Sequence, residues 1–225
     1  AASHDLRQPL TALSYHVATV QALASQQKDE RLAQVGAGLR RALQDSQALL
    51  NSLMEVSQLD AGAVAVQAED VDLLELLRRC ADDYAPQASQ QGLAFDCVLP
   101  ELPEGETLRV HTDPALLRRI LSNLFSNALK FTAQGRICLM LHREGERAAL
   151  SVQDSGPGIA PELKERVFEE FFQINNSGRN RAQGLGLGLA IVRRLVHLLG
   201  LELKLESQPG QGSCFTLWLP LGSAS

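Results

Sequence analysis

Residues 123–131 have the sequence Asn-Leu-Phe-Ser-Asn-Ala-Leu-Lys-Phe. Asn123 and Asn127 are four residues apart and Lys130 follows three residues later, so a helix places all three on one face. The opposite face carries apolar side chains, namely Leu121, Leu124, Ala128 and Phe131. Carboxamide oxygens suit Mg²⁺ and an ammonium group suits phosphate. This stretch therefore predicts an amphipathic helix that buries one face and presents a metal or phosphate site on the other.

The segments around this stretch predict a domain of mixed helices and strands. The central helix is expected over Pro114–Phe131, with Asp113 as its N-cap. Further helices are expected at Asp72–Gln91 and Gly188–Leu199, and strands at Leu93–Leu99, Arg136–Arg143, Arg147–Asp154, Leu201–Ser207 and Ser213–Leu219. The elements do not alternate as βαβ units. The predicted fold class is therefore α+β, an α/β sandwich over residues 63–225 with helices on one face of a mixed or antiparallel sheet.

Two glycine-rich segments are candidate ligand loops. Asp154-Ser-Gly156-Pro-Gly158-Ile follows a predicted strand, where glycines allow the backbone to approach a ligand and the carboxylate can accept a hydrogen bond from an exocyclic amine. Alone, such a segment is usually a turn.

The second segment has alternate glycines, Gly184, Gly186 and Gly188, which run into a predicted helix. Its backbone amides and the helix N-terminus favour an anion. It is neither a Walker motif nor a GxGxxG dinucleotide motif. The alternative is a flexible loop that closes on the helix. The preceding residues Gln173–Gln183 are rich in Asn, Gly, Ser and Arg, and are interpreted either as a surface loop or as a lid.

The first 62 residues carry heptad repeats. Apolar side chains recur at steps of three and four, at Leu6, Leu10, Leu13, Val17 and Val20, and again at Leu32, Val35, Leu39, Ala42, Leu49, Leu53 and Val56. A polar break at residues 25–30 separates the two runs, and Asp60 and Gly62 end the second. This pattern predicts a helical hairpin over residues 1–62 that forms a four-helix bundle in a homodimer. The alternative is an intramolecular coiled coil that packs on the rest of the chain.

His4 lies just off this seam, at a position that faces solvent. Asp5 follows it, and Pro9 removes the amide that would bond to the carbonyl of Asp5. An exposed histidine on a helix usually has no special role, so its interpretation depends on its neighbours.

Composition excludes several classes of function. The net charge of −5 argues against a nucleic-acid-binding or anionic-membrane surface. No window is apolar enough for a membrane span, and no signal peptide is present. The cysteines, Cys80, Cys97, Cys138 and Cys214, form no CxxC pair and are expected to be reduced. We therefore expect a cytoplasmic fragment whose upstream part is missing; a membrane anchor of the full-length protein in that upstream part is compatible with this expectation.

Taken together, the motifs resemble those of the sensor histidine kinase core. Ser3–Leu10 resembles the H-box of that family, as found in hybrid kinases, and residues 123–131 resemble its N-box. Asp154–Ile159 and Gly184–Gly188 resemble its two glycine boxes, and Phe168–Phe172 resembles its F-box. The five motifs occur in the family's order over nearly the whole chain.

The resemblance implies an ATP-binding fold shared with gyrase, MutL and the heat-shock chaperone ATPases. By it, Asn127 is a Mg²⁺ ligand, Asn123 supports the metal and phosphates, and Lys130 contacts phosphate. Asp154 binds the adenine amine, and Phe131 and Thr216 belong to the base pocket. The glycine boxes bind ATP through Gly156, Gly158, Gly184, Gly186 and Gly188.

The resemblance also implies a reaction in which His4 is the phospho-acceptor and Asp5 orients its ring. The phosphoryl group then passes to an Asp of a response-regulator receiver domain, in cis or in trans. Related hydrolases carry, at the place of Asn123, a Glu that acts as general base for water. The carboxamide of Asn123 cannot accept a proton at neutral pH, so the chain is poorly equipped for hydrolysis. Gln8 stands where most members have Thr or Asn to position water for phosphatase activity. The alternatives are a gyrase- or MutL-type ATPase and a nucleotide-binding scaffold without transfer.

Overall fold

The computed structural model describes residues 2–27, 29–103, 107–174 and 185–222, and their side chains from residue 9 onwards except residue 27. The chain divides into two compact units, Ala1–Ala61 and Gly62–Ser225. The sequence placed the boundary one residue later, between residues 62 and 63.

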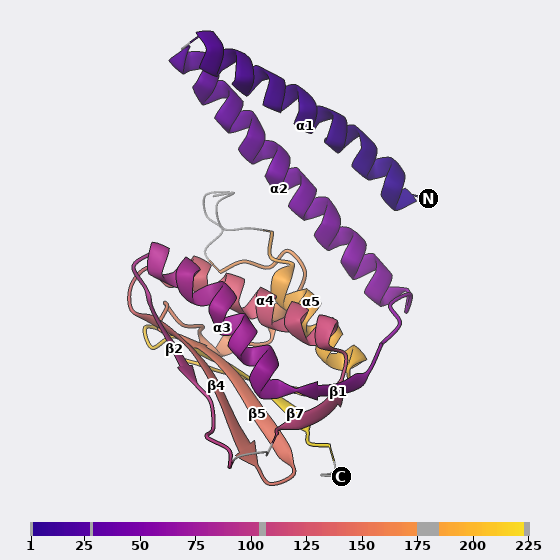
Figure 1. Cartoon of the computed structure of the whole chain (residues 1–225), viewed down its shortest axis with the longest axis vertical. Coiled ribbons are helices and arrows are strands. Elements are labelled where there is room, and N and C mark those ends of the chain that lie inside the picture. Colours follow the sequence, from indigo (N-terminus) through magenta and orange to yellow (C-terminus); the bar gives the residue numbers. More distant parts are fainter. Residues whose placement is uncertain (1, 28, 104–106, 175–184, 223–225) are drawn as a thin grey trace. The chain divides into compact units, whose positions relative to one another are not determined.

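The first unit is a helical hairpin of α1 (Ala2–Gln27) and α2 (Glu30–Asp60) (Figure 1). The predicted break at residues 25–30 is shorter than expected, because α1 continues to Gln27. Asp29 alone starts the second helix, since its carboxylate accepts hydrogen bonds from the amides of Arg31 and Leu32. Helix α2 ends at Asp60, and Gly62 has a φ of +63°.

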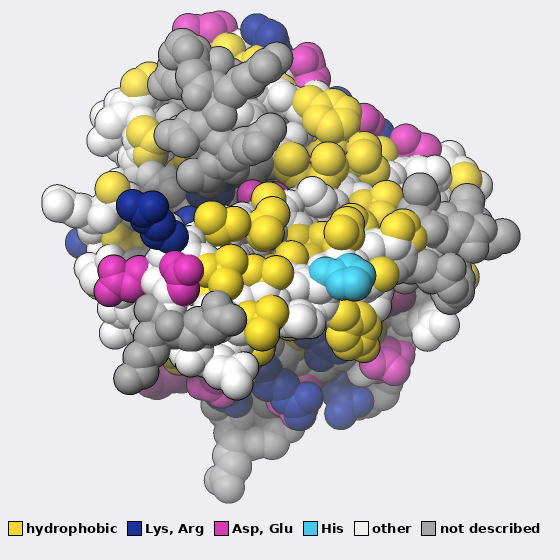
Figure 2. All heavy atoms as spheres, turned by 90° about the horizontal axis from the view of Figure 1, so that it is seen from above, with side chains coloured by type: hydrophobic (Ala, Val, Ile, Leu, Met, Phe, Trp, Pro, Cys, Tyr) yellow, Lys and Arg dark blue, Asp and Glu magenta, His cyan; other side chains and the backbone are white. Residues whose placement is uncertain are grey.

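The predicted heptad seam is only partly buried within this hairpin. Val17, Ala24 and Val56 are its buried apolar residues, and a hydrogen bond of 3.2 Å from Gln47 to Ser14 joins the two helices. Large seam side chains remain exposed: Leu13, Val35, Leu39 and Leu53. Figure 2 shows hydrophobic side chains gathered on the molecular surface. One copy of the hairpin therefore leaves much of its own apolar seam in contact with water.

The second unit is a two-layer α+β sandwich, as predicted. Its five-stranded mixed sheet has the order β2-β4-β5-β7-β6, with β2 parallel to β4 and the other pairs antiparallel. The strands are β2 (Ala94–Val98), β4 (Arg136–Glu144), β5 (Arg147–Asp154), β6 (Glu202–Ser207) and β7 (Ser213–Pro220). Three helices cover one face of it: α3 (Leu73–Gln90), α4 (Pro114–Phe131) and α5 (Gly188–Leu198) (Figure 1).

A second, two-stranded sheet was not predicted. Strands β1 (Glu69–Asp72) and β3 (Arg109–Thr112) pair antiparallel. The sequence Glu-Asp-Val-Asp of β1 has little strand propensity, so this pairing comes from tertiary contacts that no local pattern reveals. Two short 3₁₀ turns, η1 (Pro161–Leu163) and η2 (Arg166–Phe168), precede the second glycine segment.

Helix α4 forms the centre of this unit. Its N-cap Asp113 accepts hydrogen bonds from the amides of Ala115 and Leu116, and from that of Gln67 in the segment before β1. Burial raises the pKa of Asp113, but these backbone amides outweigh it and lower the pKa below its usual value. The inner face of α4 is fully buried at Leu117, Ile120, Leu121, Leu124 and Phe125. Its outer face is thereby fixed in rotation, which positions the two asparagines.

Candidate nucleotide site

The start of α5 meets the two asparagines of α4. A Cβ atom placed on Gly188 would lie 3.1 Å from Oδ1 of Asn123 and 3.8 Å from Nδ2 of Asn127. The Asn123 amide nitrogen donates to the carbonyl of Arg119 at 2.9 Å, which leaves its oxygen turned towards Gly188. Asn127 and Gly188 are 61 positions apart in the sequence (188 − 127), yet the N-box-like face and the N-terminus of α5 form one polar surface.

Lys130 and Phe131 lie at the end of α4. The Nζ atom of Lys130 is 4.4 Å from the centroid of the Phe131 ring, and partial desolvation lowers the pKa of this ammonium group. Phe131 is 45% exposed. The expectation that Phe131 shares the buried apolar face with Leu124 is therefore wrong: Ala128 and Leu129 of the same turn are buried, whereas the Phe131 ring is not. Its ring is available to another planar group.

Asp154 ends strand β5 on the helix-covered face of the sheet. It shares that face with the buried side chains of Leu150 and Val152, which precede it by four and two residues. Its carboxylate accepts the amide of Gly156 at 2.8 Å and interacts with the amide of Ser213. Burial nevertheless raises the pKa of Asp154 above its usual value. A half-buried carboxylate of this kind gains from a ligand that donates a hydrogen bond to it.

Gly156 and Gly158 bring their loop against two other segments. A Cβ on Gly156 would lie 3.2 Å from the carbonyl oxygen of Phe131 and 3.3 Å from Oγ1 of Thr132. Gly158 has a φ of +70°, and a Cβ there would lie 1.9 Å from the carbonyl oxygen of Gln208. The loop can pack in this way only with glycine at position 158.

The F-box-like segment contacts the second glycine segment. The amide of Phe171 donates to the carbonyl of Gly186 at 3.0 Å, and Phe171 is the non-glycine residue with positive φ, 60°, in the described chain. Glu170 forms an ion pair of 2.5 Å with Arg194 of α5. These contacts join residues 170–171 to the second glycine segment and to the middle of α5. Gly184 and most of the predicted lid, residues 175–183, lie outside the described residues.

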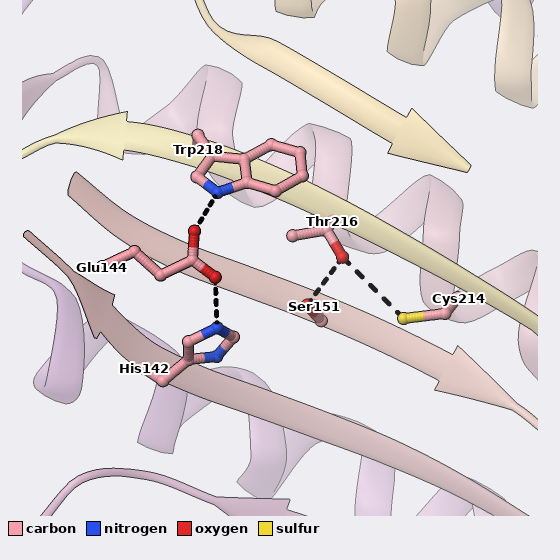
Figure 3. Close-up of polar contacts among 6 residues, drawn as sticks. All are labelled: His142, Glu144, Ser151, Cys214, Thr216 and Trp218. Atoms are coloured by element: carbon pink, nitrogen blue, oxygen red, sulfur yellow. Dashed lines mark hydrogen bonds and ion pairs between the residues drawn. The ribbon is translucent and has the colours of Figure 1, made fainter. Parts of the chain in front are cut away.

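Thr216 does not lie with the other predicted ATP-binding residues. Its hydroxyl bonds to that of Ser151 at 2.9 Å, and it shares the open face of the sheet with His142 and Trp218 (Figure 3). Asp154 is three residues from Ser151, so its side chain points to the opposite face. The register of the strands therefore contradicts the expectation that Thr216 belongs to the base pocket.

Ser213 occupies the place that was expected for Thr216. It pairs with Asp154 across β5 and β7, and is 7% exposed. Its hydroxyl lies 3.1 Å from that of Ser207, which donates to the carbonyl of Gly212 at 2.7 Å. The signal for Ser213 was its position directly after Gly212, because strand β7 begins there. Without the register, the sequence could not distinguish it from Thr216.

His4, Asp5 and Gln8 belong to α1 by their backbone, and their side chains lie outside the described residues. Helix α1 continues through Pro9. No helix of the described chain is long and apolar enough to cross a membrane.

Comparisons with known proteins match both units. Residues 1–62 match the family model of the His Kinase A (phospho-acceptor) domain, and residues 112–223 match that of the histidine kinase-, DNA gyrase B- and HSP90-like ATPases. The chain belongs to the histidine kinase family. Its second unit is accordingly an ATP-binding domain of histidine kinase type, with ATP as substrate.

Named histidine kinases are similar over nearly the whole chain. The circadian input-output histidine kinase CikA of Synechococcus elongatus is 35% identical over 97% of this chain and 29% of its own length. The adaptive-response sensory kinase SasA of Crocosphaera subtropica is 32% identical over 97% of this chain and 57% of its own length. The crystal structure of full-length ShkA in complex with AMPPNP superposes with a TM-score of 0.80 at 29% identity, over 100% of this chain and 45% of that one. This histidine kinase chain thus spans between 29% and 57% of the length of these relatives.

Proposed function

We propose that this chain phosphorylates His4 with Mg-ATP and passes the phosphoryl group to an Asp of a response-regulator receiver domain. The observation that carries the proposal is the convergence of Asn123 and Asn127 on the N-terminus of α5 at Gly188. That arrangement gives a polyphosphate both amide dipoles and the positive end of a helix.

In the proposed complex, the adenine amine donates to Asp154 and the base lies against Phe131. Support comes from the raised pKa of Asp154 and from the exposure of the Phe131 ring. Gly156 and Gly158 bring their loop close to the base, and the Ser213 amide holds the Asp154 carboxylate.

The phosphates are proposed to lie between Lys130 and the amides of the second glycine segment, Gly184, Gly186 and Gly188. Asn127 is the proposed Mg²⁺ ligand, and Asn123 supports the metal and phosphates. Among the described residues, no group of three or more His, Cys, Asp or Glu side chains is arranged to hold a metal ion. A neutral carboxamide together with phosphate oxygens fits Mg²⁺, which usually binds through few protein ligands. When bound, Mg²⁺ offsets the charge of the phosphates.

The proposed chemical step needs one nucleophile. A neutral ring nitrogen of His4 attacks the γ-phosphorus in line, the bond from phosphorus to the bridging oxygen breaks, and ADP leaves with that electron pair. Asp5 accepts a hydrogen bond from the other ring nitrogen, so it fixes the tautomer and stabilises the positive charge. Lys130 stabilises charge on the phosphates.

Hydrolysis is the competing function, and Asn123 argues against it. Its side chain is a carboxamide, which cannot take a proton from water at neutral pH, and its amide nitrogen is already bonded to the carbonyl of Arg119. A protein nucleophile such as His4 does not need that base. Gln8 retains a carboxamide that can orient water, so it is the candidate residue for dephosphorylation of the regulator.

A homodimer is proposed through the hairpin. The exposed seam residues Leu13, Val35, Leu39 and Leu53 present an apolar surface that a second copy can bury. A four-helix bundle formed in this way leaves the polar faces of α1 in water, where a receiver domain can reach His4.

The test is incubation with γ-labelled ATP and Mg²⁺, in which protein label and free phosphate are both followed. The proposal expects an acid-labile, alkali-stable label on the protein, little free phosphate, and loss of label in Asn127→Ala. Steady phosphate release without label would indicate an ATPase. Nucleotide binding with neither product would indicate a scaffold.

A further inference from the structure

Thr132 follows the last residue of α4 and carries a buried hydroxyl without a hydrogen-bond partner in the described chain. The residue is 3% exposed. Its amide donates to the carbonyl of Ala128 at 3.0 Å, so its backbone completes the helix. The hydroxyl takes no part in that cap. Buried hydroxyl groups are nearly always paired, so this one indicates a partner that the protein itself does not supply.

The surroundings of this hydroxyl belong to the proposed adenine pocket. Oγ1 of Thr132 lies 3.3 Å from the point where a Cβ on Gly156 would stand, and Oδ1 of Asp154 lies 2.8 Å from the same point. The carbonyl oxygen of Phe131 is 3.2 Å from it. The hydroxyl, the carboxylate and the loop glycine therefore pack closely around one point, where even the Cβ atom of another residue at position 156 would be crowded.

Thr216 shows how a purely structural threonine behaves in this domain. It is 8% exposed, yet its hydroxyl is bonded to Ser151 at 2.9 Å and lies near the Cys214 thiol at 3.8 Å (Figure 3). Two buried threonines thus differ in one respect: the hydroxyl on the open face of the sheet is paired, and the one beside Asp154 is not.

We propose that Thr132 helps to recognise adenine, by donating its hydroxyl hydrogen to ring nitrogen N1, directly or through one bridging water. The inference rests on the proposed function, in which Asp154 accepts the adenine amine. N1 lies next to that amine on the same edge of the base and is an acceptor, which a hydroxyl beside the carboxylate can satisfy. Asp154 and Thr132 would then read a donor and an adjacent acceptor, the pattern that distinguishes adenine from guanine.

The experiment compares ligands that differ by one ring atom. ADP, 1-deaza-ADP and 7-deaza-ADP are titrated calorimetrically against the wild-type chain, Thr132→Val and the matched control Thr216→Val. The wild type should bind 1-deaza-ADP roughly five- to tenfold more weakly than ADP, the effect of one hydrogen bond. Thr132→Val should bind both equally and weakly. Thr216→Val should keep the wild-type difference, and 7-deaza-ADP should bind all three chains as ADP does.

Each outcome decides the matter. Equal binding of ADP and 1-deaza-ADP by the wild type would overturn the role of Thr132 while leaving the nucleotide site intact. Failure of the wild type to bind ADP would overturn the proposed function and this inference together. The unfolding midpoint of Thr132→Val, measured without nucleotide, distinguishes a folding defect from a loss of recognition. Removal of an unpaired hydroxyl should not lower this midpoint. A loss of the N1 preference in a variant with an unchanged midpoint therefore supports the inference.

Discussion

Replacement of Asp154 by Asn should weaken nucleotide binding without destabilising the empty protein. In the folded chain, burial holds the pKa of this carboxyl above its usual value, although the amides of Gly156 and Ser213 oppose the shift. The folded state therefore binds the Asp154 proton more tightly than the unfolded state does. Protonated Asp154 therefore stabilises the folded state. This stabilisation is fully present below the pKa that Asp154 has in the unfolded chain, and it is lost as the pH rises through the higher pKa of the folded chain.

At neutral pH the wild type thus carries a charge that its surroundings disfavour, and Asn removes that charge. Unfolding by urea, followed by circular dichroism at pH 7, should give the same or a higher midpoint for Asp154→Asn. Binding should move in the opposite direction. A hydrogen bond to a charged group contributes about 1.5–3 kcal/mol, so ADP affinity should fall roughly ten- to a hundredfold.

The pH dependence adds a second readout for the same substitution. ADP affinity of the wild type should fall as the pH is lowered through the raised pKa of Asp154, and that of Asp154→Asn should not follow this titration. If the variant bound ADP as well as the wild type, or unfolded at clearly lower urea without any change in affinity, the role given to Asp154 would be refuted.

Three further substitutions test packing and assembly. Gly158→Ala should lower the free energy of unfolding, measured by urea titration, by about 2–5 kcal/mol, because its methyl group would overlap a backbone carbonyl at a positive φ. The control Gly145→Ala also has a positive φ but lies in open space, so its free energy of unfolding should fall by only about 1–2 kcal/mol. Phe171→Gly should raise the free energy of unfolding by about 1 kcal/mol, since the φ of 60° at this position disfavours a side chain. A lower free energy of unfolding than that of the wild type would show that contacts of the exposed ring outweigh the backbone strain. Leu39→Glu should convert a dimer into monomers in light scattering, whereas Gln44→Glu, also exposed, should not; a monomeric wild type would contradict the proposed bundle.

Much of the fold followed from local patterns, because each pattern had a local cause. The 3.6-residue periodicity around Asn123 and Asn127 predicted α4, and the Asp113-Pro114 pair fixed its start, since both residues act within the first turn. The turn at Asp29 was predicted too long. Ser25, Gln26 and Gln27 belong to α1, and polarity alone does not distinguish an exposed helix end from a loop.

The rest depended on contacts between distant segments. The pairing of β1 with β3 has no local signal in either four-residue strand. Ser213 and Thr216 look equivalent as small hydroxyl residues at the start of one strand, and only the register with Asp154 and Ser151 separates them. The unpaired hydroxyl of Thr132 was also invisible, because burial and the lack of a partner are properties of the packed site.

The most direct test of the account is the location of the phosphoryl group. Wild type, His4→Gln and His16→Gln are incubated with γ-labelled ATP and Mg²⁺; His16 lies on the same helix and is exposed, so it controls for a general effect of histidine loss on α1. The account predicts acid-labile label on the wild type and on His16→Gln, and none on His4→Gln. Label that persists in His4→Gln, or disappears only in His16→Gln, would contradict the assignment of His4 as the phospho-acceptor.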